Sequence, residues 1–286
     1  MMKSIIIDGN NNMWRAYSTH RNFIKSHPGV VGMFRIYISL LKKFGNDCVY
    51  YFVWDCGKSK ERMEIYPEYK KKVKVFTPEE EKAYKEVISE INIFESFLRY
   101  LPVYSIKIPG NEGDDIIACI SVLVDDSCVI VSTDEDFFQL LVNPKISVYN
   151  PIKDIIYDSI NFKSIMGIDR EKFLLYRSLV GDNSDNIIGV PSIGPKRARE
   201  IVLKYEIADI MLDRVDGKFS KLLNKYKDRI SLNMSLISFN LSNDLKEKVC
   251  NQMKESRVST VDLKSIEKLL WKYDIVELYD LLKEFV

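Results

Sequence analysis

Three short apolar runs in the first half of the chain each end at or beside an aspartate. Each run is rich in β-branched or aromatic residues, which is typical of buried strands, and segments with helical periodicity separate the runs. The runs and their acids are residues 3–7 with Asp8, residues 48–54 with Asp55, and residues 127–132 with Asp134. Because alternating strands and helices form a mostly parallel sheet with helices on both faces, we expect an α/β fold. The acids should then meet at the carboxyl edge of the sheet, where such folds place their active sites.

Six further acids lie in short polar clusters that read Gly-Asn-Glu-Gly-Asp-Asp, Ser-Thr-Asp-Glu-Asp and Gly-Asp-Asn-Ser-Asp-Asn. Any one of these acids has an ordinary explanation as a helix cap or a turn residue. As a set they need cations, because two carboxylates ~4 Å apart repel each other by about 4 kcal/mol at an effective dielectric near 20. We therefore predict that nine acids form one metal site: Asp8, Asp55, Glu112, Asp114, Asp115, Asp134, Asp136, Asp182 and Asp185.

A site made only of carboxylate oxygens favours hard ions, so Mg²⁺ or Mn²⁺ is expected rather than zinc. The chain has only two histidines, His20 and His27, and five scattered cysteines, which excludes a His-rich zinc site and chemistry that depends on a histidine base. Two such ions would activate water and stabilise the leaving oxygen of a phosphodiester. The sequence thus favours metal-dependent phosphodiester hydrolysis.

Two other classes of acidic site do not fit the sequence. A haloacid-dehalogenase-type phosphatase needs a second aspartate two residues after its nucleophile, but Asn10 stands two residues after Asp8. A calcium-binding EF-hand needs alternating acids followed by glycine, but Phe137 and Phe138 follow the acids at 134–136.

The charge balance points to a polyanionic partner. The net charge is +1, but once nine of the 41 acids are assigned to one site, the remaining 32 face 42 Lys and Arg, an excess of ten. Part of this excess lies in residues 56–82, a basic and aromatic insertion beside Asp55. A second basic element, residues 189–198, places Gly189 and Gly194 around an apolar turn before a helix. Glycines there permit positive φ and close approach of a phosphate, and Lys196 and Arg197 add charge, so this segment is expected to bind the DNA backbone.

With these residues in view, the chain resembles the 5′-nuclease family, which includes flap endonucleases, phage 5′-to-3′ exonucleases and the N-terminal nuclease domain of bacterial DNA polymerase I. The resemblance runs from Asp8 to about Tyr205. Its most specific motif is residues 181–191, which continues through Ile193 and Gly194 to Lys196. The supporting motifs are residues 132–136, 112–115 and 66–70.

The resemblance implies a PIN-like α/β core over residues 1–167, with residues 56–86 as a helical arch that admits a single-stranded 5′ end. It also implies a helical DNA-binding portion over residues 168–286, with a helix-three-turn-helix around residues 181–205 that often holds K⁺. By the same resemblance the nine acids surround two metal ions, and Lys70 and Arg15 reach the scissile phosphate. Departures occur at Gly113, where alanine is usual, and at Val73, where arginine is common.

The arch supplies further DNA-binding candidates. Tyr69 is expected to stack on a base, and Arg62, Lys71 and Lys72 to contact DNA, although for Lys71 and Lys72 a solvated helix face is an equal alternative.

We therefore expect a structure-specific 5′ nuclease of replication or repair, acting as 5′-to-3′ exonuclease and flap endonuclease. Its partners would be DNA with a 5′ flap, a nick or a free 5′ end, and the RNA primer of RNA–DNA hybrids. The start of the chain has no signal-peptide pattern, so we expect a cytoplasmic protein, in a bacterium or in the host of a phage. We also expect a monomer that does not associate with a membrane. The alternatives are a PIN-type ribonuclease and a catalytically inactive DNA-binding paralogue.

Overall fold

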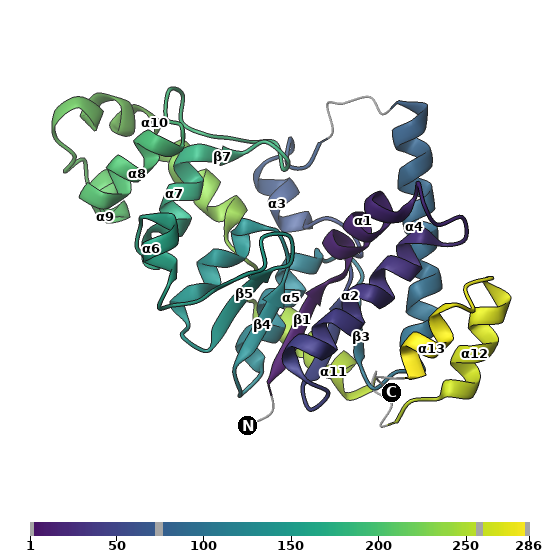
Figure 1. The fold of residues 1–286 in the computed structure, drawn as a ribbon. Helices are drawn as coiled ribbons and strands as arrows, with labels where there is room; N and C mark the ends of the chain where they lie inside the picture. The colour runs from purple at the N-terminus through teal and green to yellow at the C-terminus, as the bar shows by residue number, and fades with distance from the viewer. Residues whose placement is uncertain (1–2, 72–76, 256–259, 284–286) are drawn as a thin grey trace.

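A six-stranded sheet forms the centre of the protein in the computed structural model, which describes residues 3–71, 77–255 and 260–283 (Figure 1). The strand order is β3-β2-β1-β4-β5-β6, and all neighbours are parallel except β5 and β6. The expected mostly parallel sheet is therefore confirmed. The strands are β1 (Ser4–Asp8), β2 (Val49–Val53), β3 (Tyr104–Ile106), β4 (Cys128–Val131), β5 (Ile146–Asn150) and β6 (Ile155–Tyr157).

The side chains of β1 alternate between two cores, one on each face of the sheet. Ile5 and Ile7 pack on one face against α1 (Gly9–His20), α2 (Pro28–Phe44) and α4 (Pro78–Leu98). Ile6 packs on the other face against α5 (Gly113–Leu123) and the 3₁₀ segment η1 (Glu135–Val142). Because side chains on a strand alternate with period two, a central strand covered on both faces must be apolar throughout.

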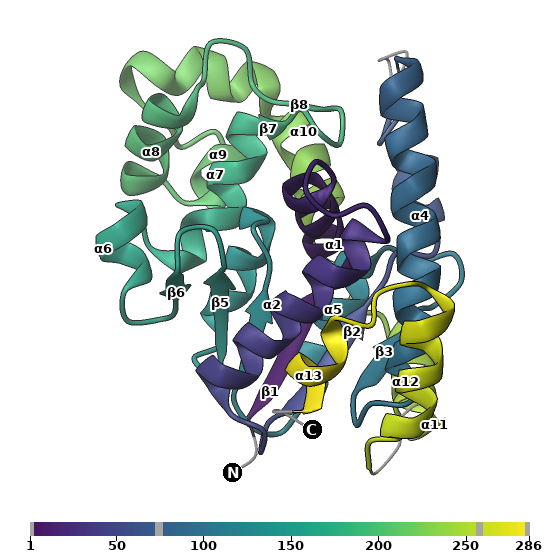
Figure 2. The same ribbon diagram turned by 45° about the vertical axis from the view of Figure 1, so that its right-hand side comes forward.

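The segment expected to form the arch contains α3 (Lys60–Ile65) and the first turns of α4. Helix α4 begins with a capping box in which Thr77 and Glu80 satisfy each other's backbone N–H groups, after which Pro78 starts the helix. In Figure 2 its N-terminal end extends past the sheet and stands apart from the group of helices around α8 (Pro195–Lys204). Residues 72–76, which include Lys72 and Val73, lie outside the described residues.

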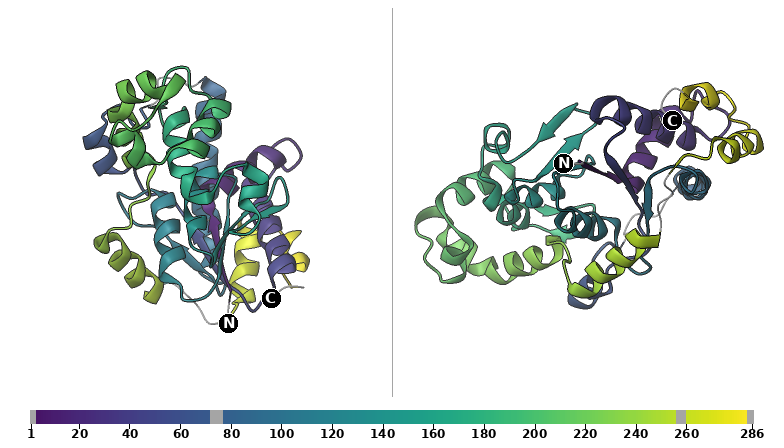
Figure 3. Two further views of the ribbon diagram at one scale, coloured as in Figure 1. Left: turned by 90° about the vertical axis from the view of Figure 1, so that its left-hand side faces the viewer. Right: turned by 90° about the horizontal axis from the view of Figure 1, so that it is seen from below.

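A group of helices lies at one end of the sheet, on the side of β5 and β6 (Figures 1 and 3). The hairpin of β7 (Gly181–Asp182) and β8 (Ile187–Ile188) follows α7 in this group. The other elements are α6 (Phe162–Met166), η2 (Arg170–Lys172), α7 (Phe173–Val180), α8 (Pro195–Lys204), α9 (Ile207–Met211), η3 (Gly217–Phe219) and α10 (Ser220–Ile237).

The last helices of the expected helical portion, residues 168–286, return to the α/β core. Helix α11 (Asn243–Glu255) contacts α5 and β3. Helices α12 (Leu263–Lys272) and α13 (Leu278–Lys283) lie beside α2 and α4 and add apolar side chains to their core (Figure 2). No helix among the described residues combines the length and the apolar character that a membrane crossing requires.

Candidate active site

A pocket of about 590 Å³ opens at the carboxyl edge of the sheet. Five of the nine predicted acids line it, together with Lys70 and Lys58 from the arch segment and an apolar wall of Trp14, Tyr84 and Ile88. The five acids are Asp8, Asp55, Glu112, Asp114 and Asp134.

Sheet register brings these acids to the same edge. Asp8 ends β1, where it is opposite Val53 of β2, and Ile7 is opposite Val131 of β4. The residues that follow β2 and β4 therefore flank Asp8. Its carboxylate caps α1 by accepting a hydrogen bond from the Asn11 backbone N–H at 3.0 Å, and it accepts a second from the Ser132 hydroxyl at 2.7 Å.

Asp55 connects the end of β2 to the start of α5. Its Oδ1 accepts a hydrogen bond from the Gly113 backbone N–H at 2.6 Å. A Cβ added at Gly113 would lie 2.9 Å from the same oxygen. Gly113 departs from the family pattern, in which alanine is usual. With alanine at this position, the methyl group would require the Asp55 side chain to move.

Burial raises the pKa of two pocket acids, Asp8 and Asp114. It raises the pKa of Asp8 to about 7, with smaller contributions from Asp55 and Asp134, against the hydrogen bonds from Ser132 and Asn11. Burial also raises the pKa of Asp114 well above its ordinary value, and the nearby Asp8 and Asp134 add to the rise. Because these carboxyl groups are buried close together, their ionised forms are unfavourable. A bound cation would stabilise the ionised forms, so the pocket strongly favours cation binding.

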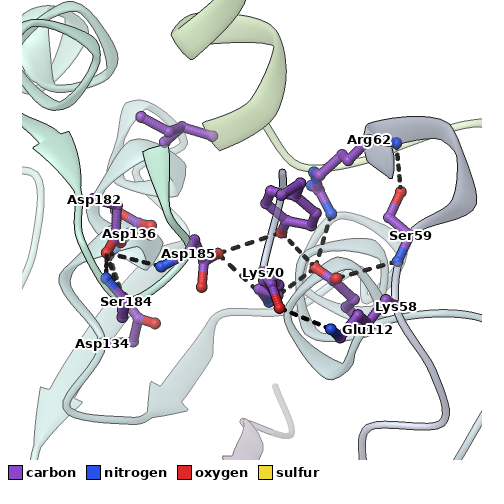
Figure 4. A network of polar contacts seen from close by, with 12 residues as sticks. Lys58, Ser59, Arg62, Lys70, Glu112, Asp134, Asp136, Asp182, Ser184 and Asp185 are labelled. Carbon is purple, nitrogen blue, oxygen red and sulfur yellow. Dashed lines mark hydrogen bonds and ion pairs between the residues drawn. The ribbon is translucent and has the colours of Figure 1, made fainter. Parts of the chain in front are cut away.

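Three of the remaining acids, Asp136, Asp182 and Asp185, form a second group beside the pocket. Asp136 in η1 and Asp182 in β7 both bind Arg177, whose Nε lies 2.6 Å from Asp136 and whose Nη2 lies 2.7 Å from Asp182. Figure 4 shows Asp185 between this group and Glu112. The ammonium of Lys70 lies 3.1 Å from Glu112 and 3.5 Å from Asp185.

In the described ranges, no three acid, histidine or cysteine side chains already surround one metal position. Lys70 and Arg177 hold four of the acids, Glu112, Asp185, Asp136 and Asp182, in ion pairs. The donor chemistry still fits a hard divalent ion, because the pocket offers carboxylate oxygens and its lining contains no imidazole or thiolate.

Two arch residues expected to contact DNA are buried in the protein instead. Tyr69 is 3% exposed, and its hydroxyl donates to Glu112 at 2.9 Å, so its ring is not available to stack on a base in this conformation. Arg62 is 6% exposed and binds Asp115 and Glu112. Lys71 is exposed and forms an ion pair with Glu68, while Lys72 lies outside the described residues.

Arg15 does not line the pocket. Its Nη2 donates to Asn12 Oδ1 at 2.8 Å, and its buried Nε has no hydrogen-bond partner.

The Gly-rich turn is organised differently from the sequence-based expectation. Neither Gly189 nor Gly194 has a positive φ; that conformation belongs to Gly181, Asn186 and Ser192. Gly189 is needed for close packing, because an added Cβ would lie 2.1 Å from the Val180 carbonyl oxygen. Gly194 faces open space directly before α8. Lys196 and Arg197 are exposed in the first turn of α8, as a phosphate-binding helix start requires.

Both parts of the chain match models of one protein family. Residues 3–167 match the 5′-3′ exonuclease N-terminal, resolvase-like domain, and residues 168–262 match the 5′-3′ exonuclease C-terminal SAM fold. The chain belongs to the 5′-3′ exonuclease family. Its membership makes it a structure-specific 5′ nuclease, a hydrolase that acts on DNA.

Relatives of this 5′-3′ exonuclease family member span nearly its whole length. The 5′-3′ exonuclease of Aquifex aeolicus is 28% identical over 99% of this chain and 95% of its own. Flap endonuclease Xni of Shewanella pealeana is 30% identical over 83% of this chain and 91% of its own. The T5 D15 protein co-crystallised with metal ions has the same fold, with a TM-score of 0.72 and 24% identity over 97% of this chain and 99% of its own. Another structure of the T5 flap endonuclease contains DNA and metal ions.

Sequence reasoning missed Arg177, which connects acids from the two family domains. Its one sequence signal is a basic residue within the otherwise apolar helix that leads directly into the motif at 181–191. The predicted 5′ nuclease fold thus brings together eight acids around the pocket and beside it, whereas the ninth, Asp115, binds Arg62.

Proposed function

We propose that this chain hydrolyses DNA phosphodiesters near the 5′ end of substrates with a 5′ flap, a nick or a free 5′ end. It would use two Mg²⁺ ions, for which Mn²⁺ can substitute. The observation that supports this most directly is the acid-lined pocket to which the core and the arch both contribute. The ions would be held by the acids in and beside the pocket: Asp8, Asp55, Glu112, Asp114, Asp134, Asp136, Asp182 and Asp185.

The protein's own groups would position the substrate around the ions. Divalent ions supply a reactive water at neutral pH and stabilise the departing oxygen. Lys70, which lines the pocket from the arch segment, would bind the scissile phosphate, with Lys58 beside it. Arg15 requires a rearrangement to reach that phosphate, since it does not line the pocket. The apolar wall of Trp14, Tyr84 and Ile88 would contact the bound DNA strand on the side away from the ions and exclude water there.

The helical portion would bind the duplex beside the cut. The first turn of α8, which no side chain caps, presents Lys196 and Arg197 at a helix N-terminus, where backbone N–H groups favour a phosphate. We include in the proposal a K⁺ ion at this turn, the RNA primer of hybrids as a second substrate, a monomeric state and a cytoplasmic location. We also propose a domain boundary at residues 167/168, after which the helices from residue 243 onwards pack against the α/β core.

No observation favours the two alternatives. A PIN-type ribonuclease would not need the helical portion that matches the C-terminal exonuclease domain. An inactive paralogue would be expected to lack acids, but the pocket retains them.

Cleavage of 5′-labelled flap, nicked, blunt and single-stranded oligonucleotides with and without Mg²⁺ tests the proposal. We expect Mg²⁺-dependent products near the junction of single and double strand. Asp134→Ala and Asp182→Ala should abolish cleavage while duplex affinity stays within roughly tenfold, since Lys and Arg contacts dominate binding. Asp244→Ala, at an exposed ion pair on α11, is the matched control. Full activity in Asp134→Ala or in Asp182→Ala would contradict the two-metal assignment.

A further inference from the structure

Arg62 and Asp115 form a buried, two-pronged ion pair beneath the arch. Arg62 Nη1 donates to Asp115 Oδ2 at 2.8 Å, and Arg62 Nη2 donates to Asp115 Oδ1 at 2.8 Å. The backbone N–H of Asn240 donates to the same Oδ1 at 2.8 Å. Both oxygens of Asp115 are therefore committed to protein donors.

Asp114 and Asp115 are adjacent in α5 but face different surroundings. Successive residues of an α-helix point about 100° apart, so two neighbours cannot face the same pocket equally. Asp114 lines the acidic pocket, and Asp115 does not. The helix phase thus directs one carboxylate to the site and the other to Arg62.

The remaining contacts of Arg62 reach two other parts of the protein. Its Nη1 also lies 3.1 Å from Glu112 Oε2, on the acid that starts α5 and lines the pocket. Its Nη2 donates to the Ser238 carbonyl oxygen, at the end of α10, at 2.8 Å. Helix α10 in turn contacts the end of α7 and the hairpin strand β8, because Asn233 Nδ2 donates to the carbonyl oxygens of Ser178 and Ile188. One guanidinium therefore connects α3, α5 and the helical portion.

We propose that Arg62 and Asp115 are a positioning pair and that Asp115 is not a metal ligand. The pair fixes the base of the arch and the carboxylate of Glu112 relative to the pocket, and connects both to α10. Removing the pair should move Glu112 and Lys70 out of position, although none of the acids proposed to bind metal is itself substituted. This inference deepens the proposed function, and it rests on that function only for its cleavage readout.

Metal binding tests the assignment of Asp115 without any need for cleavage. Calorimetric titration with Mn²⁺ should show binding weakened at least about tenfold in Asp114→Asn. In Asp115→Asn the affinity should stay within about threefold of the parent protein, because the amide oxygen can still accept a hydrogen bond from Arg62 and keep Arg62 beside Glu112. The two substitutions are matched, since they remove the same charge from adjacent residues of α5. Equal losses in the two variants would make Asp115 a metal ligand and overturn the proposal.

A paired substitution separates positioning from mere structural support. Arg62→Met leaves the buried Asp115 carboxylate without its cationic partner, so we expect a lower Tm. Adding Asp115→Asn removes that charge and retains an oxygen for the Asn240 N–H, so the Tm should recover most of the loss. Flap cleavage by the double variant should nevertheless stay at least about tenfold below the parent. Recovery of parental cleavage together with the Tm would show that the pair only stabilises the fold.

Arg62→Lys provides a variant with the charge retained in case Arg62→Met does not fold. Lysine cannot reproduce the planar two-pronged contact, so kcat should fall about tenfold while KM for the flap changes less than threefold. An unchanged kcat would contradict the positioning role. If the parent protein cleaves no substrate, the proposed function fails, and the Mn²⁺ titration still decides the role of Asp115.

Discussion

At the scale of single residues, burial raises the pKa of several carboxyl groups in and beside the pocket. Asp8 is 7% exposed, and its burial is the largest cause of a pKa near 7. Asp136 and Asp185 follow the same rule, since burial raises the pKa of each to about 6. Without divalent ions, the folded chain therefore holds protons that the unfolded chain releases at much lower pH.

The resulting prediction concerns pH and stability. Because the folded-state pKa of Asp8 is raised from 3.8 to about 7, the folded chain binds more protons than the unfolded chain between about pH 4 and pH 7. The contribution of Asp8 to the free energy of unfolding then falls as pH rises through this window. In EDTA, the Tm of the parent should drop more between pH 5 and pH 7.5 than the Tm of Asp8→Asn. Parallel curves for the two proteins would contradict the raised pKa.

At the scale of an element, the two glycines of the turn before α8 serve different purposes. Gly189 packs against the end of α7, where the Val180 carbonyl oxygen leaves no room for a side chain. Gly194 has no neighbour within 4 Å of an added Cβ and keeps a negative φ. The same residue type thus supports packing in one case and leaves open space at a helix start in the other.

Alanine at each position should distinguish these purposes. Gly189→Ala forces the β7–β8 hairpin away from α7, and we expect a loss of about 2 kcal/mol or more in the free energy of unfolding. Gly194→Ala should stay within about 1 kcal/mol of the parent, the size of an N-cap change. Urea denaturation monitored by circular dichroism measures both. Equal stability of the two variants would show that the turn adapts.

At the scale of the whole molecule, the C-terminal helices pack against helices from the N-terminal half of the chain. Helices α12 and α13 pack on α2 and α4, the helices that cover the sheet next to the pocket. Ile266 and Leu270 point into this core, whereas Trp271, the next residue, is 70% exposed. The C-terminal helices therefore share a hydrophobic core with the N-terminal strands, and we expect them to unfold together.

Two adjacent substitutions test this packing. Leu270→Ala should lower the free energy of unfolding by about 2–5 kcal/mol, because it leaves a cavity in a shared core. Trp271→Ala should change it by about 0.5 kcal/mol or less, as is usual for an exposed side chain. The urea transition of Leu270→Ala should remain a single step. A separate early transition would instead mean that the C-terminal helices unfold on their own.

The strands and most of the pocket were predictable because their signals are local. Apolar runs that end at Asp8, Asp55 and Asp134 specify strand ends, and the carboxyl edge of a parallel sheet brings such ends together. The roles of Arg62 and Tyr69 were not predictable in this way. A basic and aromatic segment has the same composition whether it faces DNA or, as here, packs on buried carboxylates.

The sequence by itself determined the α/β class, the acids available to the site and the family motifs that surround them. These features depend on hydrophobic periodicity and on acids that directly follow apolar runs, and both can be read from residues that are adjacent in the chain. Only the tertiary structure decided the partners of the charged groups. Asp114 faces the pocket and Asp115 faces Arg62 because of the phase of α5 against its neighbours. Arg177 joins Asp136 to Asp182 because α7 packs beside η1. Such pairings depend on contacts between segments far apart in the chain, which no local pattern encodes.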